Sequence, residues 1–267
     1  ANIPPGHSAR LRTYLGAEAK RAVIERDTDM LTSDEYRTNA KDVAAAIYEE
    51  LKIWIEHNCF ERRPKREARN ILDVRWVGKW KWIKSKADPS KMVRVIRMRM
   101  TQRGFKDRDA GSLITFSGTA SRTSQKLVVS ETCCRHHRGF RLRTVDVRKA
   151  FLKGVTYAEL AKATGEKPRI VNFVLEPDIV AVLKRFPGFR DFDPTTEVLG
   201  NLKPGTGCVD APRCFAMKLD SAFTAFGAGK TVYDHHIRYR HIESSSSSSF
   251  GPELDFIASD LVDDVKV

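Results

Sequence analysis

The chain has 267 residues, of which 41% are hydrophobic, so it can bury one large core or two smaller ones. It contains no run of about 18 apolar residues and no signal peptide at its start, which argues against a membrane span and predicts an intracellular protein of the cytoplasm or nucleus, not a secreted one. Its net charge of +13 points to an acidic partner, and its five cysteines form no C-x-x-C pair, as is common in a reducing compartment.

The first predicted element is one helix over residues 33–58. Ser33 is a candidate N-cap because acidic residues occupy the first turn after it. Apolar residues then recur at helical spacing, namely Val43, Ile47, Leu51 and Trp54. The pattern predicts a helix with one apolar face, followed by a polar, basic linker over 61–70.

Two strands joined in a hairpin are predicted next. In the stretch VRWVGKWKWIKS one face holds Trp76, Gly78, Trp80 and Trp82, and the other holds Val77, Lys79 and Lys81. VRVIRMRMTQRGF alternates in the same way. Asp88 and Pro89 are turn-forming residues between the two stretches.

This hairpin lies in the most basic part of the chain. Residues 61–110 hold 17 Lys and Arg against 6 Asp and Glu, a net charge of +11, with three tryptophans interleaved. Because phosphates are bound by Lys and Arg and bases stack on aromatic rings, the window predicts nucleic-acid binding. The predicted contacts are Lys79, Lys81, Arg97 and Arg103. The alternative is a solvated basic strand face above core tryptophans.

The remaining elements are predicted from capping residues and periodicity. A helix begins after Thr123 or Ser124 and ends at Gly139, and a strand follows over 140–152. YAELAKATGEKP predicts a short helix, RIVNFVLEP a strand, and the six serines at 244–249 a low-complexity loop.

Three stretches carry acidic or glycine-rich chemistry. TVDVRKAFLKG places Asp146 in an apolar strand, where an isolated carboxylate costs several kcal/mol unless it is paired or metal-bound. GTGCVDAPRCF, residues 205–215, is a glycine-rich turn that lets backbone approach a ligand. DLVDDVKV holds Asp263 and Asp264 side by side, and such a pair needs water or a cation.

In content and order, these stretches resemble the reverse transcriptase of copia-type LTR retrotransposons. TVDVRKAFLKG matches D-V-x-x-A-F-L-x-G, GTGCVDAPRCF matches G-x-x-x-A-P-R-x-W, and VDD matches the end of Y-V-D-D. RMRMTQRGF, TFSGTASRTS and RWVGKWK resemble three upstream motifs of that family, and FPGF resembles a further segment. The similarity spans about residues 70–267.

The resemblance implies an α+β fold with the fingers and palm of a right-hand polymerase. Residues 1–70 would form an N-terminal helical and basic linker segment, 71–145 a fingers-like region, and 146–267 a palm-like region that stops after the Asp-Asp hairpin, with the thumb missing. The palm sheet would be mixed or antiparallel, with helices on one face. The missing initiator methionine likewise predicts a fragment or processed piece.

The implied activity is RNA-directed DNA synthesis by two-metal nucleotidyl transfer to a primer 3′-hydroxyl. Asp146, Asp263 and Asp264 would be catalytic, with two Mg²⁺ or Mn²⁺ ions held by Asp146 and Asp263. The implied partners are an RNA template, a DNA primer, deoxynucleoside triphosphates and other polyprotein regions such as integrase or RNase H, and no membrane. Arg99, Phe151 and Gly207 match nucleotide-binding positions, with Phe151 beneath the sugar. The alternative for Phe151 is a core aromatic.

Departures from the family pattern keep a second interpretation open. Leu261, Thr206 and Gly118 stand where the family has other residues, and Asp260 is an acid in an apolar strand. A catalytically inactive remnant that retains only nucleic-acid binding is therefore the alternative function. A third alternative, a basic module unrelated to polymerases, requires the three carboxylates to lie apart. A zinc site at Cys133, His136 and His137 is not favoured, because the spacing differs from structural zinc sites.

Overall fold

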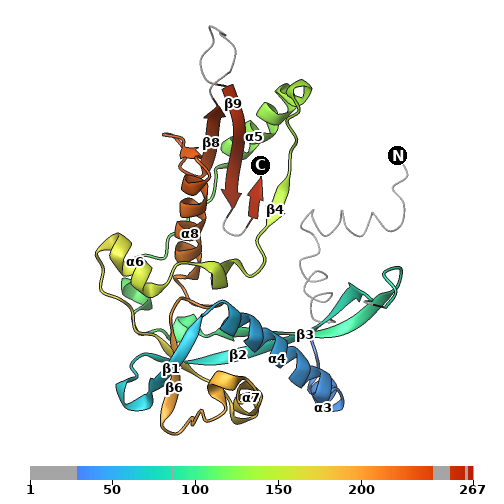
Figure 1. Ribbon diagram of the computed structural model, residues 1–267, viewed down its shortest axis with the longest axis vertical. Coiled ribbons are helices and arrows are strands. Elements are labelled where there is room, and N and C mark those ends of the chain that lie inside the picture. The colour runs from blue at the N-terminus through green and yellow to red at the C-terminus, as the bar shows by residue number, and fades with distance from the viewer. Residues whose placement is uncertain (1–28, 86, 243–252, 262–263, 267) are drawn as a thin grey trace, which may run out of the picture. The chain divides into compact units, whose positions relative to one another are not determined.

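The computed structural model describes residues 29–85, 87–242, 253–261 and 264–266 (Figure 1). It contains two compact units, each built from several chain segments. The first unit comprises Ala1–Ile53, Arg75–Thr101 and Glu176–Asp191, and the second comprises Trp54–Val74, Gln102–Leu175 and Phe192–Val267. The segments 1–70, 71–145 and 146–267 stay predictions, and Asp263 and the serine run at 244–249 lie outside the described residues.

The described α-helices are α3 (Ser33–Thr38), α4 (Ala40–Glu56), α5 (Arg122–Cys134), α6 (Tyr157–Thr164), α7 (Pro177–Leu183) and α8 (Ala211–Ala225). The described strands are β1 (Phe60–Pro64), β2 (Ile71–Lys84), β3 (Met92–Gln102), β4 (Thr144–Asp146), β5 (Asn172–Val174), β6 (Glu197–Asn201), β7 (Gly229–Lys230), β8 (Ile237–Ile242), β9 (Glu253–Leu261) and β10 (Asp264–Lys266). The 3-10 helices are η1 (Lys65–Glu67), η2 (Gly104–Lys106), η3 (Ala110–Ser112), η4 (His136–Arg138), η5 (Ala150–Lys153) and η6 (Pro187–Phe189). None of these described helices is long and apolar enough to cross a membrane.

In the first unit, the predicted single helix is interrupted at Asn39, between α3 and α4. The N-cap is Thr32, not Ser33, and Thr32 forms a capping box with Glu35. Asn39 leaves helical geometry (φ −107°, ψ 31°), and its side-chain and backbone N–H groups both donate to the Glu35 carbonyl, at 2.9 and 3.0 Å. The prediction of one continuous helix was wrong at this point.

The predicted hairpin of β2 and β3 is confirmed. Within the first unit, the backbone N–H of Gly78 donates to the Tyr36 hydroxyl at 2.8 Å, and the Trp80 indole donates to Glu35 at 2.9 Å. The guanidinium of Arg94 lies 4.5 Å from the centre of the Trp80 ring. The tryptophan face of the hairpin therefore packs on α3.

In the second unit, one sheet is mixed. β1 and β5 each pair antiparallel with β6, and β5 also pairs parallel with the start of β2, at Ile71–Asp73. The Phe60 and Phe173 rings meet edge to face with centroids 5.4 Å apart, and Trp54 is fully buried beside Phe173. The contact between Trp54 and Phe173 therefore packs the C-terminal end of α4 against the sheet.

The other sheet of the second unit is antiparallel, in the order β4-β10-β9-β8-β7 (Figure 1). Ile237 and Ile257 pack with Val128 of α5, whereas Ala258 packs with Phe223 of α8. Because Ile257 and Ala258 are consecutive strand residues, the two helices cover opposite faces. The α+β class is confirmed, but the expectation of helices on one face was wrong, because β9 is apolar on both faces.

The strand predicted over 140–152 was also wrong in length. Only Thr144–Asp146 is extended, since Lys149 adopts a left-handed conformation (φ 55°) and the chain then turns into η5. The helix predicted to end at Gly139 is found as α5 followed by η4, and Gly139 has the positive φ of 91° expected of such a cap. Its predicted start after Thr123 or Ser124 was wrong, because the N-cap is Ser121, whose hydroxyl accepts from the Ser124 N–H. The helix and strand predicted between residues 157 and 177 are confirmed as α6 and β5.

Candidate active site

The carboxyl-bearing positions 146 and 264 meet at the edge of the antiparallel sheet. β4 pairs antiparallel with β10, and Asp146 and Asp264 are direct Cα partners in that register. β9 and β10 also pair antiparallel, with Leu261 opposite Asp264. The backbone thus brings together two of the three predicted catalytic positions, whereas Asp263 lies outside the described residues.

Asp146 is not buried, contrary to the prediction from its apolar neighbours. All three residues of β4 are exposed, including Val145. β4 is the last strand of its sheet, so it has a neighbour on one side only. The Asp146 carboxylate is consequently hydrated and open to a cation from solvent, without the desolvation cost that a buried acid would carry.

The glycine-rich segment 205–210 lies in the second unit between β6 and α8. Gly207 has a φ of 95° and is exposed. A side chain at Gly104 would come within 2.2 Å of the Gly207 carbonyl oxygen, so the two backbones can meet only because residue 104 is glycine. The Gln102 N–H donates to the Thr206 carbonyl at 2.8 Å. The backbone conformation at Gly207 is therefore held by direct backbone contacts.

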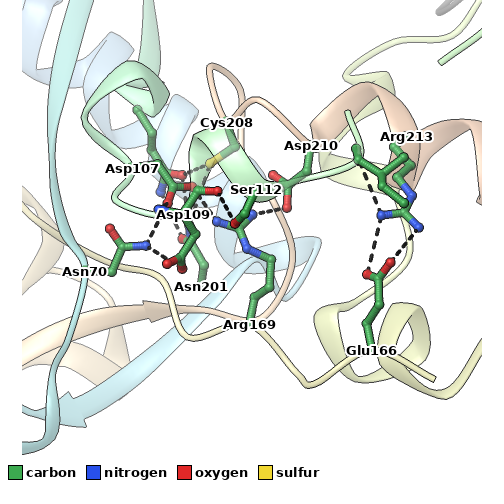
Figure 2. A network of polar contacts seen from close by, with 12 residues as sticks. Asn70, Asp107, Asp109, Ser112, Glu166, Arg169, Asn201, Cys208, Asp210 and Arg213 are labelled. Carbon is green, nitrogen blue, oxygen red and sulfur yellow. Dashed lines mark hydrogen bonds and ion pairs between the residues drawn. The ribbon is translucent and has the colours of Figure 1, made fainter. Parts of the chain in front are cut away.

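A buried polar network fixes the same segment from inside (Figure 2). The Cys208 thiol donates to the Gln102 side-chain oxygen at 2.8 Å, and Gln102 and Asn201 exchange two hydrogen bonds of 2.9 Å. The guanidinium of Arg169 bridges Asp107 and Asp210, with one nitrogen on each carboxylate. We call Arg169, Asp107 and Asp210 the Arg169 triad. The exposed fraction of the side chain is 9% for Arg169, 1% for Asp107 and 2% for Asp210.

The two carboxylates of this triad differ in their surroundings. Burial raises the pKa of Asp210, and one of its oxygens has no hydrogen-bond partner among the described residues. Burial also opposes ionisation of Asp107, but hydrogen bonds from Asn70, Arg169 and the Asp109 backbone outweigh it and lower the pKa of Asp107. The pKa values of the two carboxylates are therefore shifted in opposite directions.

The sequence patterns did not indicate Arg169 or Asp107, because the two residues lie outside every motif and 62 residues apart. The signal that could have found them is weak: Arg169 lies three residues before β5 and is followed by the apolar Ile170 and Val171. A charged residue at such a boundary requires a partner, but its sequence position does not say which one.

Phe151 lies on η5 and is half-buried. The neighbouring Ala150 and Leu152 are buried, so η5 is anchored by the residues on either side of Phe151. A half-buried ring agrees with either interpretation of Phe151, and its role as a sugar contact stays a prediction.

The predicted basic residues of the hairpin share one face within the first unit. Trp80 contacts Arg94, and a Cβ on Gly78 would meet the Met98 side chain, so even-numbered residues of both strands lie on the tryptophan face. Strand alternation then places the odd-numbered residues on the other face. Four of these are exposed and have no ion-pair partner among the described residues, namely Lys79, Lys81, Arg97 and Arg99. We call these four residues the basic strand face.

Arg103 belongs to the second unit and does not share this face. Its guanidinium pairs with Asp73 at 3.0 Å, and Lys106 pairs with the same carboxylate at 3.1 Å. Arg103 is therefore partly neutralised within the protein, which makes it a weaker candidate for phosphate binding than the basic strand face.

The departures at Asp260 and at the CCRHH stretch also have a structural outcome. Asp260 is buried, and its carboxylate lies 3.4 Å from Arg238, which in turn pairs with Asp220 at 2.6 Å. The acid in the apolar strand is thus compensated by a buried arginine. Among the described residues, no group of three His, Cys, Asp or Glu side chains is placed to hold a metal ion.

No family model, curated protein or solved structure matches this chain.

Proposed function

We propose that this chain is the RNA-directed DNA polymerase module of a copia-type retrotransposon, with a fingers and palm architecture. The observation that carries the proposal is the backbone pairing of Asp146 with Asp264 across β4 and β10. The sequence motifs mark both positions as catalytic. They lie at opposite ends of the second half of the chain, and the fold makes them direct neighbours. The third alternative, a basic module unrelated to polymerases, requires these positions to lie apart.

The donor set fits divalent magnesium or manganese. Carboxylate oxygens are the ligands that Mg²⁺ prefers, and Asp146 is exposed at the end of β4. Asp146 and Asp263 would hold the ions, with Asp264 beside them. The bound ions would supply charge stabilisation to the attacking and leaving oxygens of a phosphoryl transfer.

The chain's own residues would contact the substrates. Gly207 lies in a backbone segment held by Gln102 and by the Arg169 triad, which suits a surface against which an incoming base rests. The half-buried Phe151 would contact the sugar. The basic strand face would bind phosphates of the template and primer, since its four cations have no ion-pair partner among the described residues.

The proposal is tested by two measurements on the same protein. Binding of Mn²⁺ is followed by titration calorimetry, and incorporation of a single deoxynucleotide is followed on a DNA primer annealed to RNA. We expect Asp146→Asn to weaken Mn²⁺ binding at least tenfold and to abolish incorporation, because the site loses a charged ligand. Asp178→Asn, an exposed aspartate in the first turn of α7, is the matched control.

The inactive remnant is the second candidate, and the exposed basic strand face favours it equally. This alternative predicts salt-sensitive RNA binding by the unmodified chain with no Mn²⁺ binding that depends on Asp146. Unchanged Mn²⁺ affinity in Asp146→Asn would rule out the metal-site proposal and leave the remnant.

A further inference from the structure

The second unit contains a cavity of about 470 Å³ beside the start of α6. It is lined by residues that follow α4, η5 and β6, by the first turn of α6 and by α8. Its basic lining residues include Arg63, Lys153, Arg169, Lys203 and Lys218. We call it the basic pocket. Asp146 is not among its lining residues, so it is separate from the candidate active site.

Most of the positive charge in the basic pocket is not neutralised. Within the part of the chain that the structure describes, the ammonium groups of Lys153, Lys203 and Lys218 have no ion-pair partner. Its acidic lining residue, Glu159, already accepts hydrogen bonds from the backbone and hydroxyl of Thr156 in the capping box of α6. Hydrogen bonds from Thr156 and, to a smaller extent, the charges of Lys218 and Lys203 lower the pKa of Glu159. This carboxylate offsets part of the lysine charge, and the lining keeps a net positive charge.

The electrostatic effect of these lysines is visible on His57, which also lines the pocket. Burial lowers the pKa of His57, and the positive charges of Lys153 and Lys203 lower it further. His57 is therefore neutral at pH 7 and adds no positive charge of its own to the pocket. The positive field at this position would be relieved by a bound anion.

Two buried side chains of the lining supply further donors. The Tyr157 hydroxyl and the Arg169 Nε are both buried without a hydrogen-bond partner among the described residues. Burial raises the pKa of Tyr157 well above its ordinary value, so its hydroxyl keeps its proton. Lysine ammonium, tyrosine hydroxyl and arginine Nε–H are all donors, so the matching ligand is rich in acceptors and negatively charged.

We propose that the basic pocket binds an oligophosphate group, either as free oligophosphate or as the phosphate chain of a nucleotide. Oligophosphates carry several charged acceptor oxygens within a few ångströms, which several lysines can bind as point charges. The volume is within the range of small-molecule sites, whereas a polynucleotide backbone requires an extended groove. The inference does not rest on the polymerase proposal, since none of the predicted catalytic carboxylates lines the pocket.

The test is titration calorimetry of the 267-residue chain with sodium tripolyphosphate, in buffer with EDTA so that no divalent metal contributes. We expect saturable binding with one site per chain. The double variant Lys203→Gln with Lys218→Gln should lose about tenfold or more in affinity, because each charge-assisted contact contributes. Lys162→Gln is the matched control, since Lys162 is exposed on α6 and does not line the pocket.

The source of the oligophosphate is distinguished by repeating the titration with ATP. Equal affinities for ATP and tripolyphosphate would support recognition of the phosphates alone, and tighter ATP binding would support a nucleotide. The proposal would be overturned if neither ATP nor tripolyphosphate binds, or if only an RNA oligomer binds. It would also be overturned if Lys162→Gln loses as much affinity as the double variant Lys203→Gln with Lys218→Gln. Asp146→Asn should bind tripolyphosphate as tightly as the parent chain. The test of the basic pocket therefore does not depend on whether Asp146 holds a metal ion.

Discussion

Replacing Arg169 with methionine should destabilise the second unit by about 3 to 5 kcal/mol at pH 7.5. Arg169 is the bridging cation between Asp107 and Asp210, and all three side chains are nearly inaccessible to water. Methionine fills a similar volume but leaves both carboxylates buried without their cation, and removing one partner of a buried ion pair typically costs about this much. That is a large part of the total stability of a typical protein.

The pH dependence gives this prediction its signature. Without Arg169, burial should raise the pKa values of both carboxyl groups in the folded state above those in the unfolded chain. At a pH below these raised values the two groups are protonated in the folded protein, and no buried charge remains. The penalty should therefore be largest at pH 7.5 and smaller at pH 5. Urea unfolding followed by circular dichroism at both pH values measures it.

Two further variants keep the Arg169 prediction testable. Arg169→Lys should recover part of the stability, because an ammonium group can still neutralise one carboxylate. Arg213→Met is the matched control, since its partner Glu166 is 43% exposed and their pair should contribute less than about 1 kcal/mol. The reasoning is refuted if Arg169→Met lies within about 1 kcal/mol of the parent at pH 7.5, or if its penalty grows toward pH 5.

Three other predictions concern the loop before β8, the basic strand face and Phe151. Asp234 is partly buried, which opposes its ionisation, but hydrogen bonds from Ser124, Ser121 and His236 lower its pKa to about 2. Because the pKa of an unfolded aspartate is about 4, the ionised Asp234 stabilises the fold at pH values above that. Asp234→Ala should then cost about 1 kcal/mol at pH 6, after allowance for solvent screening, and this cost should vanish as the pH falls toward 2; a pH-independent cost in thermal unfolding would contradict it. Replacing all four residues of the basic strand face with glutamine should reduce the slope of log affinity against log salt for single-stranded RNA by about 3, measured by filter binding, and an unchanged slope would exclude this face. Phe151→Val should increase incorporation of ribonucleotides relative to deoxynucleotides in single-nucleotide assays, whereas a variant that loses its fold would identify Phe151 as a core residue.

Periodicity and capping predicted the local elements well. The alternation around Trp80 predicted the hairpin, and Gly139 was predicted as the residue that ends the helical segment of α5 and η4. These features depend on residues close in sequence, so they can be read locally. The break at Asn39 was missed because a side-chain hydrogen bond to the backbone leaves no trace in apolar spacing.

The candidate site was predictable only in part. Motif order identified Asp146 and Asp264, and the register of β4 and β10 makes them neighbours. The exposure of Asp146 was not predictable, because it follows from the place of β4 at the sheet edge and not from its apolar neighbours. The Arg169 triad joins three separate segments, and only the fold determines which charges meet.

The hydrogen bond from Cys208 to Gln102 has a consequence for thiol chemistry. Burial raises the pKa of Cys208 to about 12, and likewise that of Cys214 to about 12, so neither forms a thiolate at neutral pH. Cys133 and Cys134 are exposed at the end of α5, where alkylating reagents reach them directly. Because only the thiolate is nucleophilic, modification of Cys208 requires the 205–210 segment to open first. The rate of that slow modification therefore reports how often the backbone around Gly207 leaves its folded position.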